Sequence, residues 1–284
     1  MYTRSITSNC IKTANPNPEA QFRLFCFPYA GGRISVFSGW QEYLPASVEV
    51  CTVQMPRQGY NLQSTVPMQA DACLSILTDA LIPHLDKPFA FFGHSLGAIV
   101  SFELARNIRR NYGIEPMHLF MSGAHAPHMT KQREVASDAP KEDFLRMLRN
   151  LNGTPKEILE NPELINAVLP LIRAEFVFLE KYRYEPEQPL ATPITAFGGV
   201  DDPQVDRQSL EAWVTQTIAK FSLFLLPGDH FFINSARSQL LQIISRELRN
   251  HLKALKAGAR TQNTGDFHGF AQPTAKLPGS PAGS

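Results

Sequence analysis

The sequence lacks an excess of charge, a long apolar run and a secretory signal. Its 284 residues include 27 basic and 26 acidic side chains, for a formal net charge of +1. Nothing in this balance indicates the basic surface of a nucleic-acid-binding or membrane-surface protein. No apolar stretch is long enough to span a bilayer, and residues 1–20 lack the apolar core of a secretory signal. We therefore expect a cytoplasmic protein that binds neither nucleic acid nor a membrane.

The chain also lacks the patterns by which cysteine and histidine bind metals. Its four cysteines form no C-x-x-C pair and have no histidines at zinc-finger spacing. Cys26 and Cys51 lie in apolar runs, which predicts core positions and a reducing environment. The H-x-x-H spacing of His125 and His128 includes Pro127 and has no third ligand candidate, so we expect no metal site.

Short apolar runs alternate with helical patterns along most of the chain. Continuous apolarity in short runs is typical of strands buried on both faces, as in a parallel sheet covered by helices. We expect strands at 22–27, 48–54, 89–92, 118–122, 193–197 and 221–226, and helices at about 67–84, 96–112, 207–218 and 234–255. The alternation predicts a doubly wound α/β fold with a mostly parallel central sheet and helices on both faces.

Three segments depart from this alternation. Residues 1–20 are polar, which predicts a flexible N-terminal arm, and residues 257–284 are rich in Gly, Pro, Ser and Thr, which predicts a flexible C-terminal tail. One domain then covers residues 21–256. Within it, residues 124–190 carry helical patterns and no convincing strand. We expect a helical lid over the carboxyl ends of the strands, where open α/β sheets bind ligands; an ordinary long crossover is the alternative.

The segment G-H-S-L-G at 93–97 matches G-x-S-x-G, placed between an apolar run and a helical pattern. In this strand–turn–helix context the serine lies on a strained turn, so its neighbours two residues away must be glycine to avoid collision. The turn exposes the hydroxyl and directs the next backbone N–H toward a developing oxyanion. We expect Ser95 to be the nucleophile of an α/β-hydrolase and Leu96 to be one oxyanion-hole donor. For His94 we expect a packing role.

A late histidine and an earlier acid complete the chain order of this fold. His230 follows the run 221–226 and a Pro-Gly turn, whereas the other histidines precede the expected acid or lie in the last helix or the tail. Two neighbouring carboxylates, Asp201 and Asp202, follow the preceding strand. The spacing from Gly199 and the proline that comes next favour Asp202, with Asp201 as the alternative. His230 would take the proton of Ser95, and the aspartate would orient the imidazole.

The loop after the first long strand is expected to supply the second oxyanion donor. There the chain reads P-Y-A-G-G at 28–32, and its glycines let the backbone approach a substrate. We assign this donor to Ala30, with Gly31 as the alternative.

Five segments, taken in order, resemble motifs of the type II thioesterases of nonribosomal peptide and polyketide synthesis. They are F-P-Y-A-G-G at 27–32, G-H-S-L-G-A at 93–98, S-G-A-H-A-P at 122–127, L-I-R-A-E-F at 171–176 with Glu180 and Tyr182, and G-D-H-F-F at 228–232. The resemblance runs from about Phe22 to the end of the last helix. The segment 55–61 departs from the family's usual P-G-R-x-x-R, and Glu175 stands where the family usually has aspartate.

The resemblance implies a cytoplasmic serine thioesterase that uses no metal or nucleotide cofactor. Such an enzyme removes stalled or misprimed acyl groups from the 4′-phosphopantetheine arm of acyl or peptidyl carrier protein domains, and a monomer suits that transient docking. The lid would form the acyl pocket. Three alternatives stay open: a carboxylesterase or lipase on free esters, an acyltransferase using the same acyl-enzyme, and a catalytically silent partner that only docks carriers.

Overall fold

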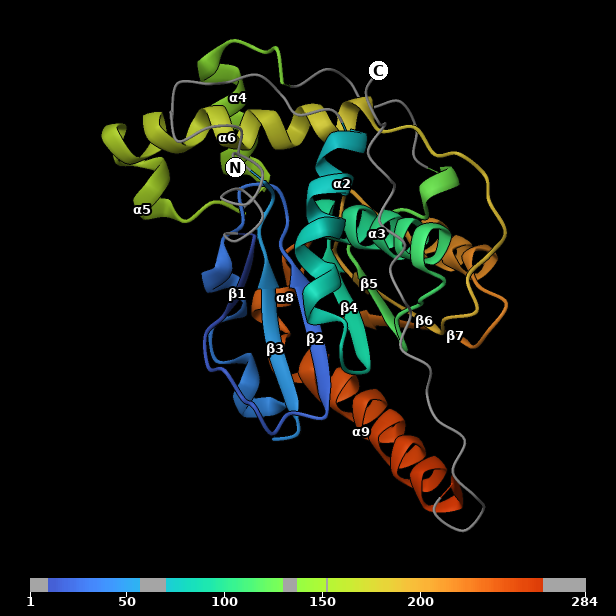
Figure 1. Ribbon diagram of the computed structural model, residues 1–284. Helices are drawn as coiled ribbons and strands as arrows, with labels where there is room; N and C mark the ends of the chain where they lie inside the picture. The colour runs from blue at the N-terminus through green and yellow to red at the C-terminus, as the bar shows by residue number, and fades with distance from the viewer. Residues whose placement is uncertain (1–9, 57–69, 130–136, 152, 263–284) are drawn as a thin grey trace, which may run out of the picture.

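A seven-stranded sheet forms the centre of the fold. The computed structural model describes residues 10–56, 70–129, 137–151 and 153–262, and the strand order is β1-β3-β2-β4-β5-β6-β7 (Figure 1). The strands are β1 (Ile11–Thr13), β2 (Phe22–Phe27), β3 (Val48–Val53), β4 (Phe89–His94), β5 (Leu119–Ser122), β6 (Ile194–Gly199) and β7 (Phe221–Leu226). All neighbouring pairs are parallel except β1 and β3. The mostly parallel sheet and its six predicted strands are therefore confirmed.

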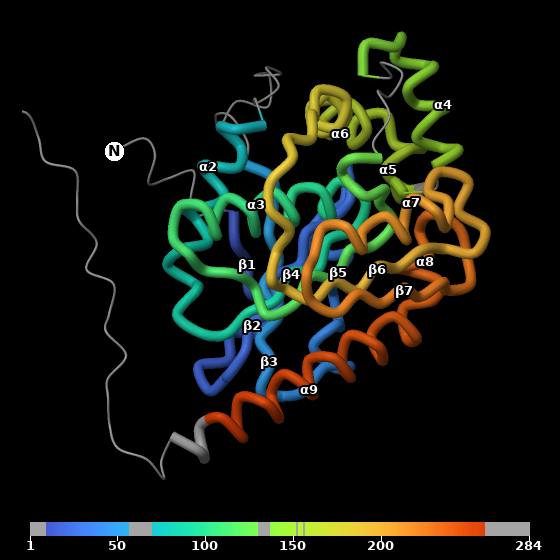
Figure 2. Tube along the Cα trace, turned by 90° about the vertical axis from the view of Figure 1, so that its right-hand side faces the viewer, coloured from blue at the N-terminus to red at the C-terminus, as the bar shows by residue number. Residues whose placement is uncertain are grey.

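Helices cover both faces of the sheet, as predicted (Figures 1 and 2). Successive side chains of β2 point to opposite faces: Phe25 and Phe27 join an apolar core with α2 (Ala70–Leu81) and α3 (Leu96–Tyr112). Leu24 and Cys26 join a second core with α9 (Arg237–Gln262). The shorter helices α7 (Arg207–Glu211) and α8 (Phe232–Ser235) follow β6 and β7. No helix among the described residues is both long and apolar enough to cross a membrane.

Both ends of the predicted domain extend further than the sequence indicated. Residues 11–13, expected in a flexible arm, form β1, whose backbone pairs with the edge of β3 and whose Ile11 packs against the core. Helix α9 continues through Gln262, past the expected start of the tail at residue 257. Residues 1–9 and 263–284 lie outside the described residues, as do 67–69 at the start of the first predicted helix.

All four cysteines are buried, and none of them forms a disulfide. Burial raises the pKa of Cys10 and Cys51 to about 11 and that of Cys73 to about 12. The core positions predicted for Cys26 and Cys51 are confirmed, and all four thiols are held in their neutral, unreactive form.

The strand order brings two loops together at one edge of the sheet. From β2 the chain crosses outward to β3, then returns to β4 on the other side of β2, and from β4 it continues away through β5. The loops that follow β2 and β4 therefore leave adjacent parallel strands in opposite directions. Such a switch point opens a crevice at the carboxyl ends of the strands, and it is there that the sequence places Ala30 and Ser95.

Between β5 and β6, the described residues include three α-helices, which lie within the expected lid at 124–190. These are α4 (Lys141–Leu151), α5 (Lys156–Leu159) and α6 (Pro162–Lys181), and Figure 1 shows them beyond one end of the strands. Asn161 caps α6, since its side chain accepts from the N–H groups of Glu163 and Leu164 at 3.0 and 3.1 Å. The lid has its own apolar cluster, which includes Phe144, Leu148 and Ile172.

The far end of α6 is fastened to the helix that carries the nucleophile. Tyr182 donates a hydrogen bond of 2.5 Å to Glu103 on α3, and the same carboxylate accepts two bonds from Arg106 at 2.8 and 2.9 Å. Because the ion pair is largely buried, losing one partner would leave an uncompensated charge in the core.

A histidine pair, of which His118 is buried and His251 is half-buried, joins the sheet to α9. His118 and His251 share a hydrogen bond of 3.0 Å, and the other ring nitrogen of His118 lies 2.8 Å from the Thr195 hydroxyl. Burial, and after it the neighbouring His251 and Lys220, lowers the pKa of His118 to about 3. Burial also lowers the pKa of His251. Both rings are therefore neutral in the folded protein at neutral pH.

This pair predicts a loss of stability in mild acid. A histidine with a lowered folded pKa takes up a proton more readily when unfolded, so its contribution is full above pH of about 6.5 and is lost as the pH falls toward 3. We expect His118→Gln to reduce the slope of unfolding free energy between pH 6 and 5 by about 1 kcal/mol per pH unit, measured by urea titration. His128→Gln, at an exposed position, is the control; equal slopes in wild type and His118→Gln would contradict the assignment.

Candidate active site

Ser95 lies on a strained turn between β4 and α3. Its φ of 54° and ψ of −115° make it the one non-glycine residue with positive φ among the described residues. A Cβ at Gly93 would overlap the carbonyl of Gly97, and a Cβ at Gly97 would overlap the carbonyl of Phe27. The Ser95 N–H donates to the Ser122 carbonyl at 2.8 Å. The glycines are thus required by close backbone packing, and the serine is fixed at the switch point.

The structure brings Asp202, and not Asp201, to His230. The Nδ1–H of His230 donates to Oδ2 of Asp202 at 2.8 Å, and the aspartate side chain is fully buried. Its other oxygen accepts from the backbone N–H groups of Gln204 and Val205 at 2.8 and 3.2 Å. Asp201 is exposed. The carboxylate is therefore held in one orientation, and the hydrogen bond fixes which imidazole nitrogen is left for a proton.

His94, for which the sequence predicted only packing, holds the backbone of His230. Its Nε2 lies 3.0 Å from the His230 carbonyl, which can only accept, so Nε2 carries the proton; the Ser122 hydroxyl donates to Nδ1 at 2.8 Å. Burial, and then the nearby His230, keeps the pKa of His94 well below its usual value. A Cβ at Gly123, whose φ is +58°, would lie 2.8 Å from the His94 ring. His94 is a neutral strut between β5 and the loop of the base.

The two expected oxyanion donors lie on either side of Ser95. Leu96 is the first residue of α3, where backbone N–H groups have no partner within the helix. Ala30 lines the same pocket as Ser95 and His230. We propose that these two N–H groups stabilise the oxyanion, and that Ser95, His230 and Asp202 form the catalytic triad.

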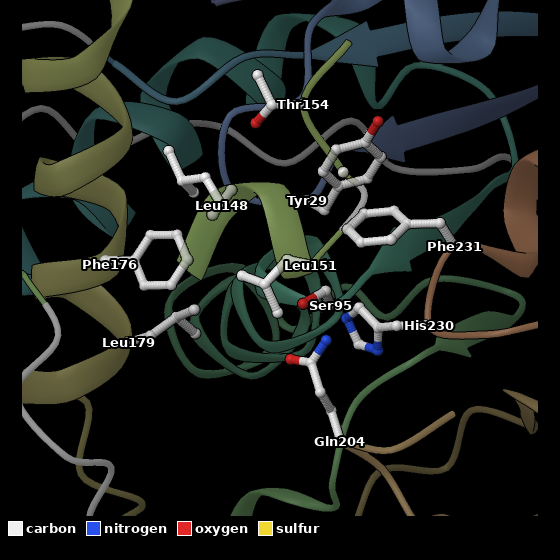
Figure 3. Close-up of a pocket in the computed structure, with 12 residues that line it drawn as sticks. Tyr29, Ser95, Leu148, Leu151, Thr154, Phe176, Leu179, Gln204, His230 and Phe231 are labelled. Atoms are coloured by element: carbon white, nitrogen blue, oxygen red, sulfur yellow. The ribbon is translucent and has the colours of Figure 1, made fainter. Parts of the chain in front are cut away.

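A pocket that is partly open to solvent lies over Ser95 and His230. Figure 3 shows the two side chains next to each other, with apolar side chains of α4 and α6 across from them. It is lined by Tyr29, Ala30, Ser95, Leu148, Leu151, Gly153, Thr154, Phe176, Leu179, Gln204, His230 and Phe231. Its apolar lining with few polar groups is typical of small-molecule sites.

Sequence reasoning missed the polar lining residues Gln204 and Thr154. Gln204 comes two residues after Asp202, and its amide points into the pocket in Figure 3. The lid also approaches the base closely at Gly153, where a Cβ would overlap the ring of Phe231. The position of Gln204 in the sequence, two residues after Asp202, could have predicted that it lies near the site. The positions of residues 153 and 154 depend on how the lid packs against the loop of the base, which the sequence does not indicate.

The chain matches the family model of the thioesterase domain over residues 22–248. Linear gramicidin dehydrogenase LgrE of Brevibacillus parabrevis is 45% identical, over 82% of this chain and 90% of the relative. Gramicidin S biosynthesis protein GrsT of Aneurinibacillus migulanus is 42% identical, over 83% and 92%. The structure of RedJ, a thioesterase of the prodiginine pathway in Streptomyces coelicolor, superposes with a TM-score of 0.76 at 36% identity, over 83% and 94%.

A parallel sheet with a strained serine at its switch point and a histidine after the last strand defines a serine hydrolase of the α/β-hydrolase fold. Within this class, the chain belongs to the thioesterase family. The dehydrogenase name belongs to one relative; the dinucleotide fingerprint G-x-G-x-x-G does not occur in this sequence.

The two adjacent aspartates give a matched pair of variants. We expect Asp202→Asn to lower kcat by roughly 10³- to 10⁴-fold, because an amide at this position favours the wrong imidazole tautomer. Asp201→Asn should change kcat less than about threefold, because surface changes away from the site have small effects. Steady-state hydrolysis of an acyl thioester measures both. A larger loss in Asp201→Asn would reassign the acid.

Removing the strut should affect both stability and rate. His94→Phe fills the space but leaves the His230 carbonyl and the Ser122 hydroxyl without their partner, so we expect a loss of about 1–3 kcal/mol in unfolding free energy. We also expect a roughly tenfold to hundredfold lower kcat, because the base shifts. Ser122→Ala removes only the bond away from His230 and should retain most of kcat. Equal rates in wild type and His94→Phe would show that the strut does not position the base.

Proposed function

We propose that this thioesterase hydrolyses acyl groups from the 4′-phosphopantetheine arm of acyl or peptidyl carrier protein domains, and that it clears stalled or misprimed carriers. The observation that carries the proposal is the pocket itself. Its floor holds Ser95 and His230, and its opposite wall is apolar and comes from the lid. The apolar wall would pack against an acyl chain, while the thioester carbonyl would lie next to Ser95 and His230.

Acylation would begin with attack of the Ser95 hydroxyl on the thioester carbonyl as His230 takes its proton. Asp202 stabilises the imidazolium through its 2.8 Å hydrogen bond. The N–H groups of Ala30 and Leu96 bind the oxyanion, and one such donor is typically worth 10²- to 10³-fold in kcat. The carbon–sulfur bond then breaks, and His230 returns the proton to the pantetheine sulfur.

Deacylation would use the same groups in reverse. Water attacks the ester carbonyl on Ser95 while His230 accepts a proton from the water. The bond between the acyl carbon and the Ser95 oxygen then breaks, and His230 returns the proton to that oxygen, which leaves the free acid and the serine hydroxyl. The chemistry of both steps is supplied by side chains and backbone N–H groups of this chain.

Relatives named for gramicidin S biosynthesis and for the prodiginine pathway support a role beside a carrier-protein synthase. Two solved relatives at 32% and 29% identity are described as type II thioesterases, from borrelidin and yersiniabactin biosynthesis. The expected monomer and the cytoplasmic location stay predictions.

The direct test compares two substrates that carry the same acyl group. A carrier protein loaded with acetyl-phosphopantetheine is set against a free acetyl ester, with release of acetate as the readout. We expect kcat/KM to be at least about 100-fold higher for the carrier, because contacts to the arm and the carrier add binding energy that is used in the transition state.

Ser95→Ala should release acetate from neither substrate. Turnover of the free ester without release from the carrier would contradict the proposal and indicate a carboxylesterase. Faster loss of the acyl group on addition of an alcohol or amine, with transfer to that acceptor, would indicate an acyltransferase.

A further inference from the structure

The segment Tyr29–Gly32, here called the oxyanion turn, has a defined backbone geometry. The Gly32 N–H donates to the Tyr29 carbonyl at 2.8 Å, which closes a four-residue turn. Gly31, at its third position, has φ of +80°. This is the value that a type II turn requires there, and it differs from a type I turn in the orientation of the central peptide. The Ala30–Gly31 peptide thus adopts one of two available orientations.

A lid side chain holds this central peptide. The Gly31 N–H donates to Oε2 of Glu175 on α6 at 2.6 Å, across 144 residues of sequence. One helical turn earlier, Ile172 contacts the same glycine, since a Cβ there would lie 3.3 Å from Cγ1 of Ile172. Residues three apart share one face of a helix. The same face of α6 therefore gives the oxyanion turn an acceptor and an apolar contact.

The position of Glu175 along α6 links the lid to the acyl pocket. Ile172 belongs to the apolar cluster of the lid, whereas Phe178 and Leu179 belong to the core beside the sheet. Glu175 lies between these two parts of the helix. Its neighbour Phe176 lines the pocket with Leu179. When α6 packs against the sheet domain, it therefore completes the apolar wall of the pocket and places Glu175 against the oxyanion turn at the same time.

We propose that Glu175 is a positioning residue that makes the oxyanion hole depend on the seated lid. By accepting the Gly31 N–H, its carboxylate fixes the Ala30–Gly31 peptide and holds the oxyanion turn against α6. The Ala30 N–H, in the preceding peptide of the same turn, is positioned with it. The inference rests on the proposed role of Ala30. When α6 lifts, the acceptor leaves with it, so full transition-state stabilisation is available only with the lid closed over the acyl chain.

The role requires an acceptor and not a charge. Gln in place of Glu175 keeps a carbonyl oxygen at the same distance from the helix, so Glu175→Gln should stay within about threefold of wild type in kcat. Glu175→Leu keeps the bulk and removes the acceptor. We expect it to lower kcat by roughly tenfold to a hundredfold with KM within about threefold, since a misdirected donor loses part of what a deleted donor loses.

Two inhibitors separate this role from general damage to the lid. An acyl trifluoromethyl ketone forms a tetrahedral adduct with the serine and places an oxyanion in the hole, whereas an unreactive acyl thioether mimics the bound substrate. Glu175→Leu should weaken the ketone by the same factor as kcat/KM and leave the thioether within about threefold. Glu175→Ala, with less bulk, serves if the Leu variant does not fold.

The matched control is Glu180, a second glutamate nearer the C-terminal end of α6. It accepts the Ser137 N–H at 2.9 Å within the lid. Glu180→Leu should leave the ratio of ketone to thioether affinity unchanged. Three results would each overturn the inference. One is unchanged ketone affinity in both Glu175→Leu and Glu175→Ala, and another is a loss of ketone affinity in Glu180→Leu equal to that in Glu175→Leu. The third is a Glu175→Gln variant with kcat as low as that of Glu175→Leu. If the wild type fails to deacylate a carrier, the proposed function fails, while the ketone comparison still decides the role of Glu175.

Discussion

Backbone packing between residues 93–97 and the end of β2 is the contact on which the site depends. Because Gly97 lies against the Phe27 carbonyl with no room for a side chain, the nucleophile turn and the oxyanion turn are held at a fixed separation. Strain at Ser95 is of the order of 1–3 kcal/mol for such a conformation. It is tolerated because the hydrogen bond to the Ser122 carbonyl and the close packing at the two glycines hold the backbone in this conformation. Any larger side chain at these positions would separate nucleophile from oxyanion donors.

From that contact the remaining parts divide between the sheet and the lid. The loops that follow the strands supply the base, His230. Asp202 holds its imidazole ring, and His94 holds its backbone carbonyl. The lid supplies the apolar wall and, through Glu175, an acceptor for the oxyanion turn. Helix α6 is fastened at its C-terminal end to α3 through Tyr182 and Glu103, and it contacts the oxyanion turn through Glu175. Substrate enclosure and charge stabilisation are in this way mechanically connected.

The sequence was sufficient for features with a local signal. Buried strands are continuous apolar runs, and the nucleophile turn needs its glycines, so the sheet and residues 93–97 were predictable. The short strand β1 was missed because its three residues, with Ile11 the one apolar side chain among them, are too few to show a pattern. The choice between Asp201 and Asp202 needed the direction of each side chain. His94 and Glu175 act through partners 136 and 144 residues away. No periodicity or spacing reports such contacts, which arise only when loops meet at the switch point.

The central claim is that Ser95 carries the acyl group between the carrier and water. Acid-quenched mixing of the enzyme with an acetyl-loaded carrier, followed by peptide mass spectrometry, tests it most directly. We expect one acetyl group on the peptide that contains Ser95 before free acetate reaches its steady rate, and none in Ser95→Ala. Acetate release with no acylated peptide in either protein, or an acetyl group on a different residue, would contradict it.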